Sequence, residues 1–190
     1  MSKFTLFSWT FISFIFIIGI LQQPLRIQNI VTAQPDNIAP YNFGIYQNST
    51  FGILLQYPMN WLKEDFEDGV GFVAPSENKT DRYVETVDII VSPVSNSSLD
   101  SMVNQTIDNY KDSLNDFQLI NSTSIIVGGN PAQLILYSYS DATIGSAKAM
   151  DVITTNGSNI YNILYITKPG DFLDHIESIQ NLIESFQIRE

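Results

Sequence analysis

Apolar and polar residues alternate along most of the chain after residue 50, which is the pattern of strands that bury one face. The first clear case runs from Phe51 to Tyr57 and stops at Pro58, because proline cannot donate to a strand ladder. Turn signals at Gly128-Gly129-Asn130-Pro131 and at Asn156-Gly157 predict hairpin connections between later strands. Further strands are predicted over residues 70–74, 83–91, 117–127, 132–140, 146–155 and 159–167.

Two of the predicted strands are apolar on both faces. In the strand 132–140, apolar side chains occupy consecutive positions from Leu134 to Tyr137, and the strand 159–167 has the same character. A strand of this kind lies in a sheet that other layers cover on both sides. The hairpin links make this sheet mainly antiparallel.

Two segments place apolar residues at helical spacing and are the predicted covers. Ser97, with Asp100 three residues later, resembles the start of the first helix. The second follows Pro169-Gly170 and has Asp171 and Asp174 in its first turn, where the helix dipole favours carboxylates. The apolar positions are Leu99, Met102, Val103, Ile107, Tyr110 and Leu114 in the first helix, and Phe172, Ile176, Ile179, Ile183 and Phe186 in the second. We therefore predict an α+β fold, an α/β/α sandwich with a mainly antiparallel sheet of about six to seven strands and helices on both faces.

The first 33 residues have the pattern of an export signal. Lys3 precedes an uncharged run from Phe4 to Leu21, and Val31-Thr32-Ala33 places short residues where signal peptides are cleaved. We favour a cleaved signal peptide over residues 1–33, with an uncleaved membrane anchor as the alternative, because the run just reaches membrane-spanning length. Either way this segment engages the membrane at least during export. The rest of the chain is then secreted or held at the outer face of the cytoplasmic membrane.

The remaining chain has the length of one domain. Residues 34–42 contain two prolines and no apolar run, which predicts a tether. Residues 43–190 are then the folded domain.

Composition excludes several function classes. The chain has 190 residues, no cysteine, one histidine and a net charge of −11. The lack of cysteine excludes disulfides and thiolate chemistry, and 9 basic against 20 acidic residues argue against nucleic acid as a partner. His175 is expected at a boundary or exposed position of the second helix rather than as a catalytic base. No nucleophile elbow, phosphate loop or zinc-binding helix motif occurs, so we predict a protein that is not an enzyme.

One acidic run is the best chemical candidate. It reads Glu64-Asp65-Phe66-Glu67-Asp68-Gly69, and hard cations such as calcium bind several oxygens that converge from a loop. The candidate metal ligands are Glu64, Asp65, Glu67 and Asp68, although a solvated acidic turn is the favoured interpretation. No cofactor is required, and calcium is the one candidate ion. Paired carboxylates of a glycoside hydrolase are the alternative chemistry.

Glycosylation signals agree with export. Asn-x-Ser/Thr triplets are frequent, and in a host that glycosylates them they mark surface positions. An Asn- and Ser-rich composition is the competing explanation. The triplets begin at Asn48, Asn78, Asn96, Asn104, Asn121 and Asn156.

Several short motifs together resemble the PsbP-like family, especially its secreted archaeal members. Tyr57-Pro58-Met59-Asn60-Trp61 is followed by Phe72-Val73-Ala74-Pro75, by Ser98-Leu99-Asp100 at a helix start, by Gly129-Asn130-Pro131-Ala132 before a Tyr-rich strand, and by Glu184-Ser185-Phe186 at the end of the last helix. The resemblance covers about residues 41–188. It implies an α/β/α sandwich, the fold shared with Mog-type Ran-binding proteins. In plants and cyanobacteria the family supplies extrinsic subunits of photosystem II that support calcium and chloride retention or assembly.

These observations lead to one expectation and two alternatives. We expect an extracytoplasmic, non-enzymatic binding or assembly module with a protein partner in the envelope or membrane. The alternatives are an extracellular carboxylate-dependent hydrolase and a structural envelope protein held by an uncleaved N-terminal helix.

Overall fold

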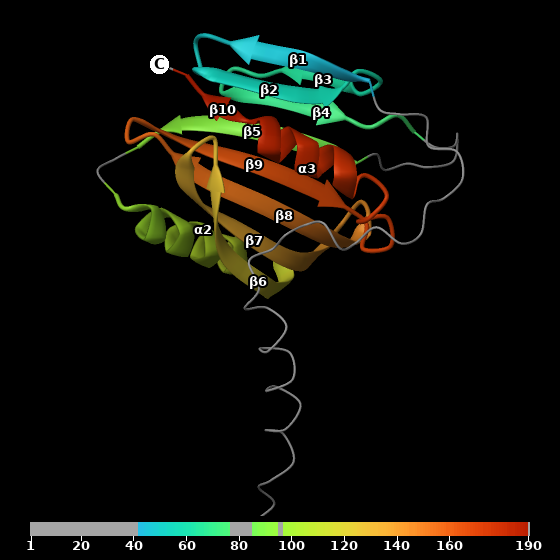
Figure 1. Cartoon of the computed structure of the whole chain (residues 1–190). Helices are drawn as coiled ribbons and strands as arrows, with labels where there is room; N and C mark the ends of the chain where they lie inside the picture. Colours follow the sequence, from blue (N-terminus) through green and yellow to red (C-terminus); the bar gives the residue numbers. More distant parts are fainter. Residues whose placement is uncertain (1–41, 77–84, 95–96, 190) are drawn as a thin grey trace, which may run out of the picture. The chain divides into compact units, whose positions relative to one another are not determined.

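The computed structural model describes residues 42–76, 85–94 and 97–189 (Figure 1). All of the described residues belong to one compact unit, Pro40–Glu190. The predicted signal or anchor segment 1–33 lies outside the described residues, as does the tether 34–42 except for its last residue. Among the residues that are described, no helix is both long and apolar enough to cross a membrane.

A seven-stranded antiparallel sheet forms the centre of the domain, in the order β3-β4-β5-β9-β8-β7-β6. The alternating and two-sided apolar patterns predicted its main strands, and only the short β3 was missed. The strands are β3 (Leu62–Asp65), β4 (Gly69–Val73), β5 (Thr86–Pro93), β6 (Asn115–Val127), β7 (Asn130–Asp141), β8 (Gly145–Thr155) and β9 (Asn159–Thr167).

A second, three-stranded sheet was not predicted. Its order is β1-β2-β10, with β1 (Phe43–Asn48), β2 (Ile53–Pro58) and β10 (Gln187–Ile188). The strand expected from Phe51 is therefore β2, and it belongs to this small sheet rather than to the central one. The two residues of β10 pair with Leu54 and Ile53, which brings the end of the chain back to its first hairpin.

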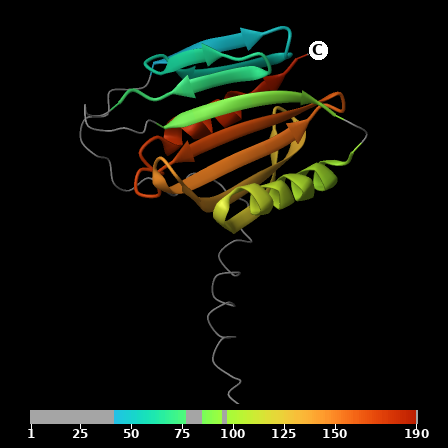
Figure 2. The ribbon, with the colours of Figure 1, turned by 180° about the vertical axis from the view of Figure 1, so that it is seen from behind.

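Two helices cover opposite faces of the large sheet, as predicted. Helix α2 (Leu99–Ser113) contacts β6, β7 and β8, and Figure 2 shows it lying across this end of the sheet. Helix α3 (Ile176–Ser185) contacts β2 and shares the other face with the small sheet. The N-cap of α2 is Ser98, whose side chain accepts from the Ser101 N–H at 3.2 Å, so the predicted cap at Ser97 was one residue early.

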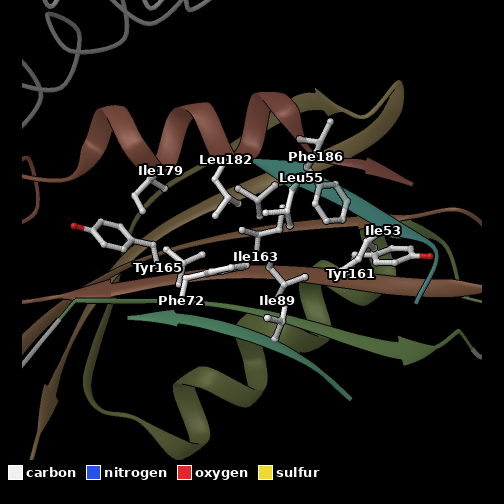
Figure 3. Close-up of a cluster of buried hydrophobic side chains, with 14 of the residues drawn as sticks. Ile53, Leu55, Phe72, Ile89, Tyr161, Ile163, Tyr165, Ile179, Leu182 and Phe186 are labelled. Carbon is white, nitrogen blue, oxygen red and sulfur yellow. The ribbon is translucent and has the colours of Figure 1, made fainter. Parts of the chain in front are cut away.

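The larger core lies between the seven-stranded sheet on one side and α3 with the small sheet on the other. Figure 3 shows Ile179 and Leu182 of α3 pointing toward Ile163 and Tyr165 of β9. These side chains are all 1% exposed or less. The periodicity of the second predicted helix therefore identified its buried face correctly. The helix begins later than predicted, at Ile176, so Asp171 and Asp174 lie in the turns before it and Glu177 is the carboxylate of its first turn.

The smaller core lies under α2. Val103 and Ile107 of the helix pack with Ile135, Tyr137 and other apolar residues of β7 and β8. The two-sided apolar pattern of β7 is explained by these two cores. At the β6–β7 turn, Gly128 and Gly129 have φ of 57° and 82°, which glycine adopts without strain.

Candidate functional site

A hollow of about 440 Å³ opens where the edge strand of the small sheet meets the edge strand of the large one. Strand β1 supplies Ile45–Asn48 to its lining, β2 supplies Tyr57, and β3 supplies Lys63 and Asp65. Figure 1 shows β1 and β3 at the same end of the domain. The hollow is therefore bounded by two strand edges as well as by side chains.

Polar contacts connect the two strands across this hollow. The Tyr46 hydroxyl donates to Asp65 Oδ1 at 3.3 Å and accepts from Asn48 Nδ2 at 3.1 Å. Lys63 forms an ion pair with Asp65, and its Nζ lies 5.6 Å from the centroid of the Tyr46 ring. The hydrogen bond with Lys63 lowers the pKa of Asp65, and the same bond raises the pKa of Lys63. Because both side chains are substantially exposed, this pair adds little to stability.

Local sequence explains how the hollow keeps its shape. Asn48 Oδ1 accepts from the backbone N–H groups of Thr50 and Phe51 at 2.8 and 3.1 Å, which fixes the turn after β1. Behind the hollow, the Phe72 ring lies 4.6 Å from the Tyr57 ring and 5.9 Å from that of Tyr46, between centroids. Phe72 is fully buried, so the aromatic floor belongs to the larger core.

The structure does not gather the acidic run into one cluster. Glu64 and Asp65 are neighbours on β3, so their side chains project from opposite faces of the sheet. Asp65 lies in the hollow. Glu64 instead acts on Asp88, whose pKa is raised mainly by burial and to a lesser degree by the charge of Glu64. All four candidate ligands are exposed, and within the described ranges no group of three or more His, Asp or Glu residues is placed to hold a metal ion.

The glycosylation triplets occupy different environments. Asn104 is exposed on α2, and Asn156 is exposed in the β8–β9 turn, where its Oδ1 accepts from two backbone N–H groups. Asn121 lies half-buried in β6. Asn48 is half-buried in the hollow with both polar atoms of its side chain hydrogen-bonded, and Asn78 and Asn96 lie outside the described residues.

His175 directly precedes α3 with a side chain that is 11% exposed, so of the two predicted environments the boundary one is found. Its ring stacks edge-on against Trp61 at 5.4 Å, and Nε2 lies 3.8 Å from Glu85 Oε2. Neither ring nitrogen, nor Trp61 Nε1, has a hydrogen-bond partner among the described residues. A general base is held by hydrogen bonds to an orienting group and a nucleophile, and the described residues supply neither to His175.

Sequence reasoning missed two buried carboxylates, Glu85 beside His175 and the more deeply buried Asp151 of β8. Asp151 is 0% exposed, and its Oδ2 accepts from the Tyr110 hydroxyl of α2 at 2.9 Å and from Asn162 Nδ2 at 3.4 Å. Burial raises the pKa of Asp151 to about 7, against the opposite effect of these hydrogen bonds. The signal for it was a carboxylate between the apolar residues Met150 and Val152 of a predicted strand. Its position below α2 indicates that it ties the helix to the sheet.

Solved structures with this fold come from several bacteria. The cyanobacterial PsbP (CyanoP) of Synechocystis sp. PCC 6803 aligns with 84% of this chain and 98% of its own, at 16% identity and a TM-score of 0.55. LpqN of Mycobacterium tuberculosis, involved in cell envelope biogenesis, aligns with 80% of this chain and 87% of its own, at 15% identity and a TM-score of 0.59.

A third structure, a Pseudomonas aeruginosa protein of unknown function described as a candidate regulator, aligns with 76% of this chain and 95% of its own. Its identity is 15% and its TM-score 0.57, so all three comparisons establish the fold alone. No curated protein shows significant sequence similarity to the chain. The family model for PsbP-like proteins, however, matches residues 10–188, and the chain therefore belongs to the PsbP-like family.

Proposed function

We propose that the protein is a non-enzymatic binding or assembly module that acts outside the cytoplasm and contacts a protein partner through the hollow between β1 and β3. The observation that carries this proposal is that both sheets end at the hollow in edge strands. Edge strands present unpaired backbone groups that an extended segment of another chain can continue.

The surroundings of the hollow favour protein contact. Large apolar side chains are exposed on the flanking strands and loop: Ile45 is 69% exposed, Met59 65% and Leu62 61%. Tyr46, Lys63 and Asp65 add donors and acceptors between them. A mixture of apolar contact and oriented polar groups is the usual character of a protein interface.

The export pattern of residues 1–33 supports a location outside the cytoplasm, with cleavage as the favoured outcome. Membership of the PsbP-like family and the likeness to an envelope-biogenesis protein agree with that location. Analysis of the mature N-terminus by mass spectrometry distinguishes a secreted protein from one held in the membrane.

Calcium at the acidic run remains a secondary proposal. Four exposed carboxylates within five residues support it, while the ion pair between Lys63 and Asp65 competes with it. Calorimetric titration tests the proposal. A saturable heat that disappears when Glu64, Asp65, Glu67 and Asp68 are neutralised is the expected result, and flat heats contradict it.

The hydrolase alternative receives no support from the carboxylates with raised pKa. Asp151 exposes none of its surface and is covered by α2, so it does not contact a substrate in this conformation. The pKa of Asp88 is raised mainly by the burial of its own side chain.

Site-specific photo-crosslinking in the native host tests the main proposal. A photoreactive residue at Gln47, which is exposed and lines the hollow, is compared with one at Gln105, an equally polar and exposed position on α2. We expect a discrete adduct from position 47 that is absent from position 105 and weakened by Lys63→Glu. Identical adducts from both positions, or none from position 47, would contradict the proposal.

A further inference from the structure

We propose that the outer edge of β6 pairs antiparallel with β6 of a second copy of this chain, which joins two seven-stranded sheets into one. The proposal is independent of the hollow, because β6 lies at the opposite end of the large sheet from β3. Three observations carry it: the length of β6, the lack of charge in β6 from Phe117 onward, and its exposed apolar side chains.

Strand β6 is the longest strand of the domain, with 13 residues, and among the described residues it pairs with β7 alone. The β6–β7 register shifts between Asn115 and Gln118 and again between Leu119 and Asn121. From Asn121 to Val127 the register is unbroken. Bulges of this kind disrupt an edge locally, so the regular part of the edge is the segment Asn121–Val127.

From Phe117 onward this edge carries exposed apolar surface and no charge, the nearest charge in the strand being Asp116 at its start. Leu119 is 44% exposed, Ile120 53% and Ile126 69%. No charged residue occurs from Phe117 to Ser140, which includes nearly all of β6 and β7. Natural proteins usually protect long edge strands with lysine, proline or a covering element, because an unprotected edge pairs with another strand.

The charge distribution selects a second copy as the occupant. The chain has a net charge of −11, so two copies repel each other over most of their surface. The uncharged hairpin of β6 and β7 is where that repulsion is weakest. A basic partner, in contrast, gains most from the acidic parts of the molecule. Antiparallel pairing of one strand with its own copy is self-complementary about a two-fold axis, as closed dimers require.

The proposed β6–β6 pairing has a defined register. Pairing centred on the regular segment places Ser124 opposite Ser124 of the second copy and Ser122 opposite Ile126. Cα atoms directly opposite each other in an antiparallel pair lie about 4.5 or 5.5 Å apart. Ser122, Ser124 and Ile126 are the exposed residues of this segment, so one continuous row of side chains crosses the junction.

Sedimentation of the full chain in a mild non-ionic detergent tests the proposal, with Ile126→Lys as the variant and Ile45→Lys as its matched control. Both isoleucines are 69% exposed on edge strands, so both variants are expected to fold, with unchanged circular dichroism and melting temperature. We expect the wild type and Ile45→Lys to rise toward twice the monomer mass as concentration increases, while Ile126→Lys stays monomeric. Equal association of all three proteins, or constant monomer mass in the wild type, would overturn the proposal.

Disulfide trapping gives a second readout, and the lack of native cysteine makes it unambiguous. Ser124→Cys places two thiols within the Cα separation of a disulfide, whereas the two copies of Ser122→Cys lie about 14 Å apart across the two-fold axis. We expect rapid dimer formation from Ser124→Cys under mild oxidation and little from Ser122→Cys. Equal rates for the two variants would indicate random collision and exclude this register.

Discussion

The two edge strands of the seven-stranded sheet differ in length, in charge and in the layer that covers them. At one end, β3 has four residues, and five of the seven residues from Leu62 to Asp68 are charged. At the other end, β6 has 13 residues, and no charge occurs from Phe117 to Ser140. Short length and charge are the two devices that prevent indiscriminate pairing at β3, and β6 from Phe117 onward has neither.

The layers that cover the two ends of the large sheet also differ. The small sheet lies over the β3 end, and the rings of Tyr46, Tyr57 and Phe72 fill the space between them. Helix α2 lies over the β6 end, where the rings of Tyr110 and Tyr137 are 4.8 Å apart. One sheet can therefore end in a polar hollow suited to a foreign partner and in an uncharged edge suited to its own copy.

The largest expected effect comes from removing the aromatic floor of the hollow. Phe72→Ala leaves a cavity in a fully buried position and should reduce the free energy of unfolding by about 3–5 kcal/mol. Denaturant unfolding measures this loss, and Phe117→Ala at the half-buried β6 end should cost less. Equal losses of unfolding free energy at the two positions would contradict the prediction that the more deeply buried ring contributes more to stability.

The next effect concerns the attachment of α2 to the β6 end. The folded pKa of Asp151 is about 7, above the unfolded value of 3.8, so the folded state retains a proton that the unfolded chain releases. Stability should therefore fall as the pH rises from about 4 to about 7, by up to about 4 kcal/mol from this group.

Asp151→Asn cannot ionise and should lose this part of the pH dependence. The measurement is the free energy of unfolding of both proteins between pH 4 and pH 8, because their difference isolates Asp151 from the other carboxylates. Parallel curves for the two proteins would show that the carboxyl is already ionised in the folded state at low pH.

A smaller effect is expected at the start of the same helix. Ser98→Ala removes the acceptor for the Ser101 N–H and should destabilise the protein by about 1 kcal/mol. Ser98→Asp, which keeps a side-chain acceptor at the cap, serves as the matched control. Thermal unfolding of both variants measures the contribution of the cap, and equal losses from Ser98→Ala and Ser98→Asp would contradict it.

The smallest effect on stability is expected at the β3 end. Lys63→Gln breaks the exposed ion pair with Asp65 and should leave the free energy of unfolding almost unchanged. Partner crosslinking from position 47 should nevertheless weaken, because the variant changes the polar lining of the hollow. A large loss of stability with unchanged crosslinking would contradict this account, because it would show that the pair stabilises the fold and does not contribute to partner binding.

The sequence predicted the elements that have a strong period of their own. The alternation in β2 and β5, the two-sided apolar pattern of β7 and β9, and the apolar stripe of the first helix correspond to observed elements. The stripe of the second helix corresponds to α3 from Ile176 to Ile183, while Phe172 and Phe186 are buried just outside that helix. The family resemblance implied the same fold class as these patterns, and the structure confirms it.

The features that were missed depend on contacts between distant parts of the chain. Strand β10 has only two residues and exists because Gln187 and Ile188 reach Leu54 and Ile53. The hollow depends on Tyr46 meeting Asp65 across two sheets, which no local pattern encodes. Asp151 lies under a helix formed some forty residues earlier, so its burial and its raised pKa follow from packing alone.

Hydrogen exchange as a function of protein concentration tests the central claim most directly. It compares backbone amides of the segment Asn121–Val127 with those of Leu62–Asp65 in the same purified full chain. The difference between the two ends predicts that protection of the β6 segment grows with concentration while that of the β3 segment stays constant. Protection that is independent of concentration at β6, or that grows equally at both ends, would contradict it.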